Sequence, residues 1–158
     1  MKNFELSHKK HLGDIAIYGY EASSLVLPVY SRESYFRANL ALLEGDVRAQ
    51  LFPKSRPVYT KVHDYPPVQY GLHADVTNSL VGDGCRLDGT VKNCIIFRGV
   101  NIARDAVVEN CVIMQGVTIT AGASLRNIVA DKNAVFRTGV SLQGADNYPV
   151  YIAKNTIL

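Results

Sequence analysis

Aliphatic residues recur with a period of about 16 along the second half of the chain, between positions 74 and 142. They form three parallel columns. The columns are Val76, Val91, Val108 and Leu125; then Val81, Ile96, Ile113 and Val129; and then Leu87, Ile102, Ile119 and Val135. This spacing fits neither the 3.6-residue period of a helix nor a plain two-residue alternation. It predicts a coiled chain with three short strands per turn, each turn stacked on the last at about one strand spacing.

Two further columns are expected to mark the corners of this coil. Asparagine occupies positions 78, 93, 110 and 127, and glycine occupies 84, 99 and 116, with Lys132 in the corresponding place in the last turn. Glycine adopts a positive φ freely, and asparagine tolerates the left-handed region. Two accounts of Lys132 stay open: either Asn133 makes the turn and reshapes the coil locally, or Lys132 is held there in a strained conformation for a functional reason.

The pattern therefore predicts a mainly β fold, with a parallel β-helix of about four coils over residues 74–158. A sandwich with regularly spaced strands is the alternative, but it does not explain three columns that keep register over four turns. Parallel crossovers are usually right-handed. The near-hexad spacing resembles left-handed hexapeptide β-helices, and the left-handed sense is inferred from that resemblance.

The first part of the chain has a different pattern. Residues 1–13 suggest a solvated leader, and residues 14–30 suggest two strands around a polar turn. Ser31 is expected to cap a helix that runs through Leu43, and residues 46–52 to add a helical turn. Residues 1–52 then form a linker of strands and helix. Residues 53–73, rich in proline and tyrosine, are expected to lie extended against the first coil, and the segment after Leu142 to form a capping tail.

Composition and charge narrow the function classes only slightly. The 158 residues are 47% hydrophobic, and the net charge of +3 is too small to argue for a nucleic-acid partner. No apolar run is long enough to cross a bilayer. Three cysteines without a visible secretory signal indicate free thiols in a reducing cytoplasm. Cys94 and Cys111 fall in one column, so they are expected on adjacent coils.

Several chemistries lack the residues that they need. Hexapeptide acyltransferases use a histidine on a coil as general base, and the carbonic anhydrase version of the fold uses three histidines around zinc. The four histidines here are at 8, 11, 63 and 73, outside the expected coils. His63 and Asp64 are adjacent in an extended segment and are expected to point apart. The column of Lys92, Glu109 and Arg126 is interpreted as a solvated ladder of alternating charge.

Three stretches together resemble a known family. They are SRESYFRANLALL at 31–43, RPVYTKVHDYPPVQY at 56–70, and NSLVGDGCRLDGTVKNCIIFRGVNI at 78–102 with LRNIVADKNA at 125–134. They resemble the C-terminal part of glucose-1-phosphate adenylyltransferase (ADP-glucose pyrophosphorylase), over essentially the whole chain. The ending SLQGADNYPVYIAKNTIL at 141–158 is most similar to the GlgD-type regulatory subunit of bacterial glycogen biosynthesis.

The resemblance implies a function without catalysis in this chain. The family's nucleotidyltransferase domain, with its glycine-rich loop and metal-binding carboxylates, has no counterpart here, so the chain is expected to be the C-terminal part of a longer protein. No cofactor and no metal are expected. The implied partners are a homologous catalytic subunit, further copies of the chain, and a phosphorylated small-molecule effector. Residue by residue, the family's effector contacts correspond to Arg126 and Lys132, with Lys154 as a further basic contact; solvated cations are the alternative.

Two other functions remain open from the sequence. The first is a free-standing hexapeptide acyltransferase that uses a base other than histidine, for which coenzyme A binding would be evidence. The second is a structural β-helix without a ligand.

Overall fold

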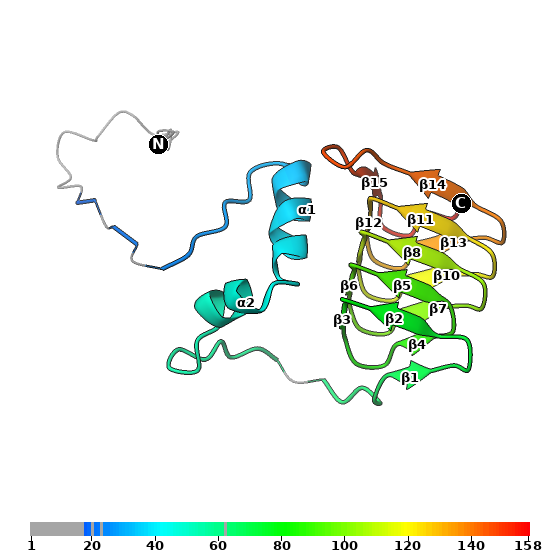
Figure 1. Cartoon of the computed structure of the whole chain (residues 1–158), viewed down its shortest axis with the longest axis horizontal. Coiled ribbons are helices and arrows are strands. Elements are labelled where there is room, and N and C mark those ends of the chain that lie inside the picture. The colour runs from blue at the N-terminus through cyan, green and yellow to red at the C-terminus, as the bar shows by residue number, and fades with distance from the viewer. Residues whose placement is uncertain (1–17, 20, 23, 62) are drawn as a thin grey trace.

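The computed structural model describes residues 18–19, 21–22, 24–61 and 63–158. Within these residues the chain forms two short helices followed by a parallel β-helix of about four turns, whose strands build three five-stranded sheets (Figure 1). Every pairing between these strands is parallel, and each strand bonds to the equivalent strand one turn earlier or later. The predicted fold is confirmed.

The three sheets form the three sides of the coil. The first sheet consists of β1 (Gln69–Tyr70), β4 (Arg86–Leu87), β7 (Asn101–Ile102), β10 (Thr118–Ile119) and β13 (Val135–Phe136). The second consists of β2 (Asp75–Thr77), β5 (Thr90–Lys92), β8 (Val107–Glu109), β11 (Ser124–Arg126) and β14 (Ser141–Gln143). The third consists of β3 (Leu80–Val81), β6 (Ile95–Ile96), β9 (Val112–Ile113), β12 (Ile128–Ala130) and β15 (Val150–Ile152).

The strand register confirms the first aliphatic column and corrects the other two at their last member. Ala130, not Val129, stacks on Ile113, and Phe136, not Val135, stacks on Ile119. At both places the true partner lies 17 residues further on, one position beyond the predicted one, because the last turn keeps the length of the turn before it. In a strand such a slip moves a side chain to the other face. Val129 accordingly lies on the outer face of the third sheet.

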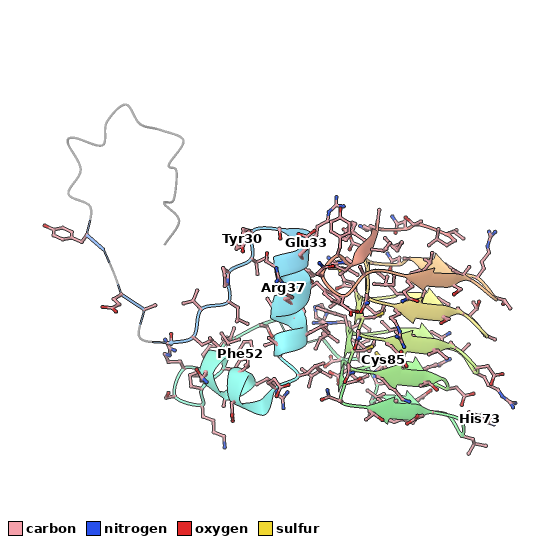
Figure 2. All side chains as sticks on the ribbon, turned by 45° about the horizontal axis from the view of Figure 1, so that its top comes forward. Tyr30, Glu33, Arg37, Phe52, His73 and Cys85 are labelled. Atoms are coloured by element: carbon pink, nitrogen blue, oxygen red, sulfur yellow. The ribbon has the colours of Figure 1, made fainter. Side chains whose placement is uncertain are left out.

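The side chains of these columns pack together in the interior of the β-helix. Ile113, Ile119 and Leu125 are fully buried, and Phe136 fills the interior of the fourth turn. The three cysteines are free and fully buried, and Figure 2 shows Cys85 within the stacked strands. The Cys111 backbone N–H lies 3.4 Å from Cys94 Sγ, which confirms that the two lie on adjacent coils, and burial raises the pKa of the Cys111 thiol. Each buried aliphatic side chain contributes about 1.5–3 kcal/mol through removal of apolar surface from water.

The corners use the left-handed region as the sequence predicts. Asn78, Asn93, Asn110 and Asn127 have φ between 44° and 53°, and Gly84, Gly99 and Gly116 have φ between 67° and 72°. In the next turn Asn133 takes this conformation, with φ 57°. Lys132 is not among the described residues with positive φ, so the strained-lysine hypothesis is wrong. The coil keeps its corner geometry there without local reshaping, because Asn133 lies 17 residues after Gly116, the same step as from Gly99 to Gly116.

Helix α1 (Arg32–Ala41) covers the outer face of the third sheet. Ser31 caps it, since its side-chain oxygen accepts a hydrogen bond from the Ser34 backbone N–H at 3.1 Å. Phe36 is 3% exposed and packs with Ile95, Val112 and Val129. Figure 1 shows α1 running along the direction in which the coils stack. The outer face of this sheet is therefore apolar because a helix lies on it.

The segments around α1 differ partly from expectation. Helix α2 (Gly45–Leu51) confirms the added helical turn. The described residues among 18–30 form no strand, and residues 1–17 lie outside the described chain. The described residues among 53–68 lack regular structure as expected, but β1 follows them and pairs with β4. Tyr65 packs over the Gly84 corner, where a side chain would collide with its ring.

Residues 141–158 add a further coil to the β-helix. β14 and β15 pair with β11 and β12, and the backbone of Ile157 bridges to that of Val135. A longer connection between β14 and β15 delays the return to the third sheet, where Ile152 pairs with Ala130. This segment therefore covers the fourth turn of the β-helix as one more layer.

Candidate functional site

Lys132 and Lys154 lie next to each other at one corner of the β-helix. Each follows a strand of the third sheet and precedes an asparagine with positive φ. The Asn155 backbone N–H donates to the Lys132 carbonyl at 2.9 Å, which places the two lysines on adjacent coils. The structure thus brings together two of the three cations that the sequence selects.

Arg126 lies apart from this pair. It ends β11, and the whole of β12 separates it from Asp131 and Lys132. Its guanidinium forms an ion pair with Glu109 on the neighbouring strand, and Lys92 pairs with Asp75 at 3.7 Å. The predicted ladder of alternating charge is therefore present on the second sheet, and Arg126 belongs to it.

Asp131 joins the lysine pair as a partly exposed carboxylate. The Lys132 backbone N–H donates to its Oδ1 at 2.7 Å, and the Tyr151 hydroxyl donates to its Oδ2 at 2.7 Å. These hydrogen bonds, followed by the charges of Lys132 and Lys154, hold the pKa of Asp131 below its ordinary value. The same hydrogen bond from Tyr151 raises the pKa of that phenol. The corner thus carries two ammonium groups and one ionised carboxylate.

Tyr151 connects this corner to α1. The Arg32 guanidinium carbon lies 5.0 Å from the centre of the Tyr151 ring, a cation–π distance. Arg32 forms no ion pair with another described residue. A continuous set of contacts therefore runs from the start of α1 through Tyr151 to Asp131 and the lysines.

A surface cavity of about 530 Å³ opens beside these contacts, and we refer to it as the tyrosine notch. Met114 and Val129, from the third sheet and its edge, form its floor. The full lining is Val29, Tyr30, Ser31, Arg32, Tyr35, Met114, Val129 and Tyr151. Burial raises the pKa of Tyr35 above its ordinary value. The notch combines an apolar floor, three phenol rings and one guanidinium.

Sequence reasoning finds the two lysines but misses Arg32, Asp131 and Tyr151. Because the connection between β14 and β15 is long, a uniform period does not predict that Lys154 stacks on Lys132. One signal was present: the dipeptide Lys-Asn occurs at 132–133 and again at 154–155, each time after a strand. A charged residue before an asparagine corner, repeated on successive coils, indicates paired side chains.

The histidines in the described chain do not form a site with these residues. His63 is exposed and stacks edge-on to Tyr65 at 6.2 Å, without an ion pair to Asp64. His73 lies between β1 and β2, within the first coil, and its backbone N–H and ring Nδ1 lie 3.0 and 3.4 Å from Asp88 Oδ1. Figure 2 shows it at the far side of the β-helix from α1. This pair stabilises an exposed turn.

Two other kinds of site are absent from the described residues. They contain no cluster of three or more histidine, cysteine or carboxylate side chains suited to a metal ion. Their helices are too short to span a lipid bilayer.

Comparison with known proteins identifies the coil. The sequence profile of the GlmU-like, C-terminal hexapeptide family matches residues 67–148, which is just over half of the chain. The chain belongs to this GlmU-like hexapeptide family. The match covers the strands from β1 to β14, so the family assignment rests on the β-helix itself.

Individual relatives of this hexapeptide chain are much longer proteins. The glycogen biosynthesis protein GlgD of Bacillus subtilis (strain 168) is 38% identical over 103 residues, which is 65% of this chain and 30% of that protein. GlgD of Geobacillus stearothermophilus is 45% identical over 69 residues, 44% of this chain and 20% of that protein. A glucose-1-phosphate adenylyltransferase of Clostridium botulinum (strain Eklund 17B / Type B) is 38% identical over 74 residues, 46% of this chain and 19% of that protein. The chain matches less than a third of the length of each.

Proposed function

We propose that this chain is a non-catalytic part of a GlgD-type glycogen biosynthesis protein, which assembles with and regulates a catalytic glucose-1-phosphate adenylyltransferase in the cytoplasm. The observation that carries the proposal is the similarity to GlgD in two species, over residues that fold into a hexapeptide β-helix. The interior of that β-helix is packed with aliphatic side chains.

The corner formed by Lys132 and Lys154, which we call the lysine corner, supports the regulatory part of this proposal. Lys132 and Lys154 are adjacent, and together they carry more positive charge than Asp131 neutralises. Two ammonium groups on one rigid corner suit a phosphate oxygen cluster, because charge-assisted hydrogen bonds are roughly twice as strong as neutral ones. We propose this corner as the contact for a phosphorylated effector. The proposal leaves out Arg126, whose guanidinium forms an ion pair with Glu109.

Complex formation tests the assembly proposal. The chain is mixed with the glucose-1-phosphate adenylyltransferase of Geobacillus stearothermophilus, a relative that is 35% identical over 74 residues, and the mixture is separated by size with light-scattering detection. The proposal predicts a complex that contains both proteins. If the two elute independently over the micromolar range, the assembly role is wrong.

The regulatory proposal has a separate test. Inorganic phosphate binding is followed by NMR for the wild-type chain, for Lys154→Gln, and for Arg126→Gln as the charge-matched control. We expect Lys154→Gln to weaken binding about tenfold, as for loss of one charge-assisted contact, and Arg126→Gln to leave it nearly unchanged. Equal effects of the two changes would mean that phosphate binding depends only on the overall charge of the protein.

A further inference from the structure

The tyrosine notch differs from the lysine corner in both shape and chemistry. Its volume of about 530 Å³ lies within the range of roughly 300–1,000 Å³ that is typical of small-molecule sites. Its floor is apolar, while Arg32 and the phenols of Tyr30 and Tyr35 supply polar groups, the Tyr151 hydroxyl being bonded to Asp131. An apolar cavity with a few convergent polar groups is the usual form of a ligand site.

The three tyrosines favour a planar ring as the occupant. Tyr35 lies on α1, Tyr30 in the segment that leads into α1, and Tyr151 on β15, so the rings come from two elements that are distant in sequence. Figure 2 shows Tyr30 just ahead of the helix, near the turn that carries Glu33. Tyr30 is 81% exposed, although a buried aromatic ring is a large source of apolar stabilisation. A flat ring over Met114 and Val129 would cover this exposed phenol.

The charges around the notch favour an anionic group on that ring. Arg32 lines the notch, and its guanidinium stacks on Tyr151 without a carboxylate partner among the described residues. Lys132 and Lys154 follow beyond Asp131, which contacts Tyr151 directly. Three cations therefore face two carboxylates, Asp131 and Glu33. Because Asp131 lies on the lysine side of Tyr151, repulsion from its charge directs an anion toward Arg32.

We propose that the tyrosine notch binds a small phosphate ester of a planar aromatic ring, with the ring over Met114 and Val129 and the phosphate on Arg32. This inference rests on the proposed effector role and deepens it, because the notch would add a second phosphate contact, at Arg32, beside a surface that recognises a ring. The ring supplies apolar contact area, and the Arg32 fork supplies directed hydrogen bonds to phosphate oxygens.

The test compares three probes that differ in one feature each: 1-naphthyl phosphate, 1-naphthol and inorganic phosphate. Binding of the two naphthyl probes is followed by their fluorescence, and binding of inorganic phosphate by NMR. We expect 1-naphthyl phosphate to bind at least about tenfold more tightly than either single-feature probe, because the ring and the phosphate contacts combine.

Two variants locate the site, and each has a matched control elsewhere. Arg32→Gln removes the cation and Tyr30→Ala removes a ring, and both residues are exposed, so the fold does not depend on them. Arg37→Gln, on an exposed position of the same helix, and Tyr59→Ala, a tyrosine that is 90% exposed, are the controls. We expect each notch variant to weaken 1-naphthyl phosphate about fivefold or more, with both controls unchanged.

The outcomes separate this inference from the proposed effector role. If 1-naphthyl phosphate binds no more tightly than inorganic phosphate, while Lys154→Gln still weakens inorganic phosphate, the notch proposal is wrong and the lysine corner stands. If 1-naphthyl phosphate binds more tightly but the notch variants and the controls behave alike, the notch is also excluded. Tight binding that depends on Arg32 and Tyr30 but not on Lys154 supports the notch without the lysine corner.

Discussion

Asn133 carries the corner that follows β12, with φ 57°, and its side-chain amide donates to Asn155 at 3.3 Å. Its exposed neighbour Lys132 has an ordinary backbone conformation. We predict that Asn133→Val lowers the free energy of unfolding by about 1–3 kcal/mol, since a β-branched residue is strained there. Lys132→Val should stay within about 0.5 kcal/mol of wild type, as for most surface changes. Urea unfolding measures both; the reverse order would contradict the register.

Ile113 lies at the centre of the interior columns and is fully buried. We predict that Ile113→Ala lowers the free energy of unfolding by about 2–5 kcal/mol, from lost burial and the cavity that remains. Ile157→Ala is the matched control, because Ile157 is 58% exposed. Denaturant unfolding of the two variants should differ clearly. A loss below about half a kcal/mol for Ile113→Ala would place this side chain outside the core.

Asp131 gives the stability of the protein a dependence on acid pH. Its pKa is lower in the folded chain than the value of about 3.9 expected when unfolded. Ionised Asp131 therefore stabilises the fold above that pH, and the contribution is lost as the pH falls through the folded pKa. We predict that Asp131→Asn lowers Tm at pH 7, and that the difference from wild type shrinks below about pH 4.

Thermal unfolding from pH 7 to pH 3 measures this effect, with the exposed Asp64→Asn as the control for general loss of charge. A Tm difference for Asp131→Asn that stays constant across this range would mean that the carboxylate is not stabilised by its Tyr151 and Lys132 hydrogen bonds.

At the scale of elements, Phe36 is the most deeply buried apolar side chain by which α1 packs on the third sheet. Phe36 is 3% exposed among Ile95, Val112 and Val129. We predict that Phe36→Ala releases α1 while the coils stay folded. Hydrogen exchange of the α1 amides should then accelerate about tenfold or more, since local opening no longer loses this burial.

The exposed Arg37→Ala is the control on the same helix. Exchange in β8 and β9 should change little in either variant. If Phe36→Ala accelerates exchange equally in α1 and in β9, the helix and the coils unfold as one unit.

Most of the coil could be predicted from the sequence because each turn repeats the same physical demand. Aliphatic side chains must face inward, and corners need asparagine or glycine, so the columns from Val76 and from Asn78 indicate the fold directly. The predictions of Val129 and Val135 are wrong because they take a step of 16 residues, whereas the last turn has the same 17 residues as the turn before it. An outer position on the third sheet is also apolar because α1 covers it, so hydrophobicity alone could not decide which of Val129 and Ala130 faces inward.

The candidate site was only partly predictable for a related reason. Family resemblance points to Lys132, but the residues linked to its neighbour Asp131 come from distant elements: Tyr151 from β15, and Arg32 from α1 through Tyr151. The first contact depends on the length of the connection between β14 and β15, and the second on how α1 docks on the third sheet. Neither is encoded in a local period.

At the scale of the whole molecule, a rigid coil carries several distinct surfaces. The lysine corner and the tyrosine notch lie on one side, next to α1, and the charge ladder lies on another sheet. The interior is filled by aliphatic side chains. Such a body suits the proposed roles of assembly and ligand sensing on its surface.

The proposed regulatory role is tested most directly by one assay: the rate of ADP-glucose formation from ATP and glucose 1-phosphate. The rate is measured for the purified chain alone, for the catalytic glucose-1-phosphate adenylyltransferase of Geobacillus stearothermophilus alone, and for the two together. We predict no product from the chain alone and a changed rate, or a changed response to phosphate, for the mixture. ADP-glucose formation by the chain alone, free of host enzyme, would contradict this role.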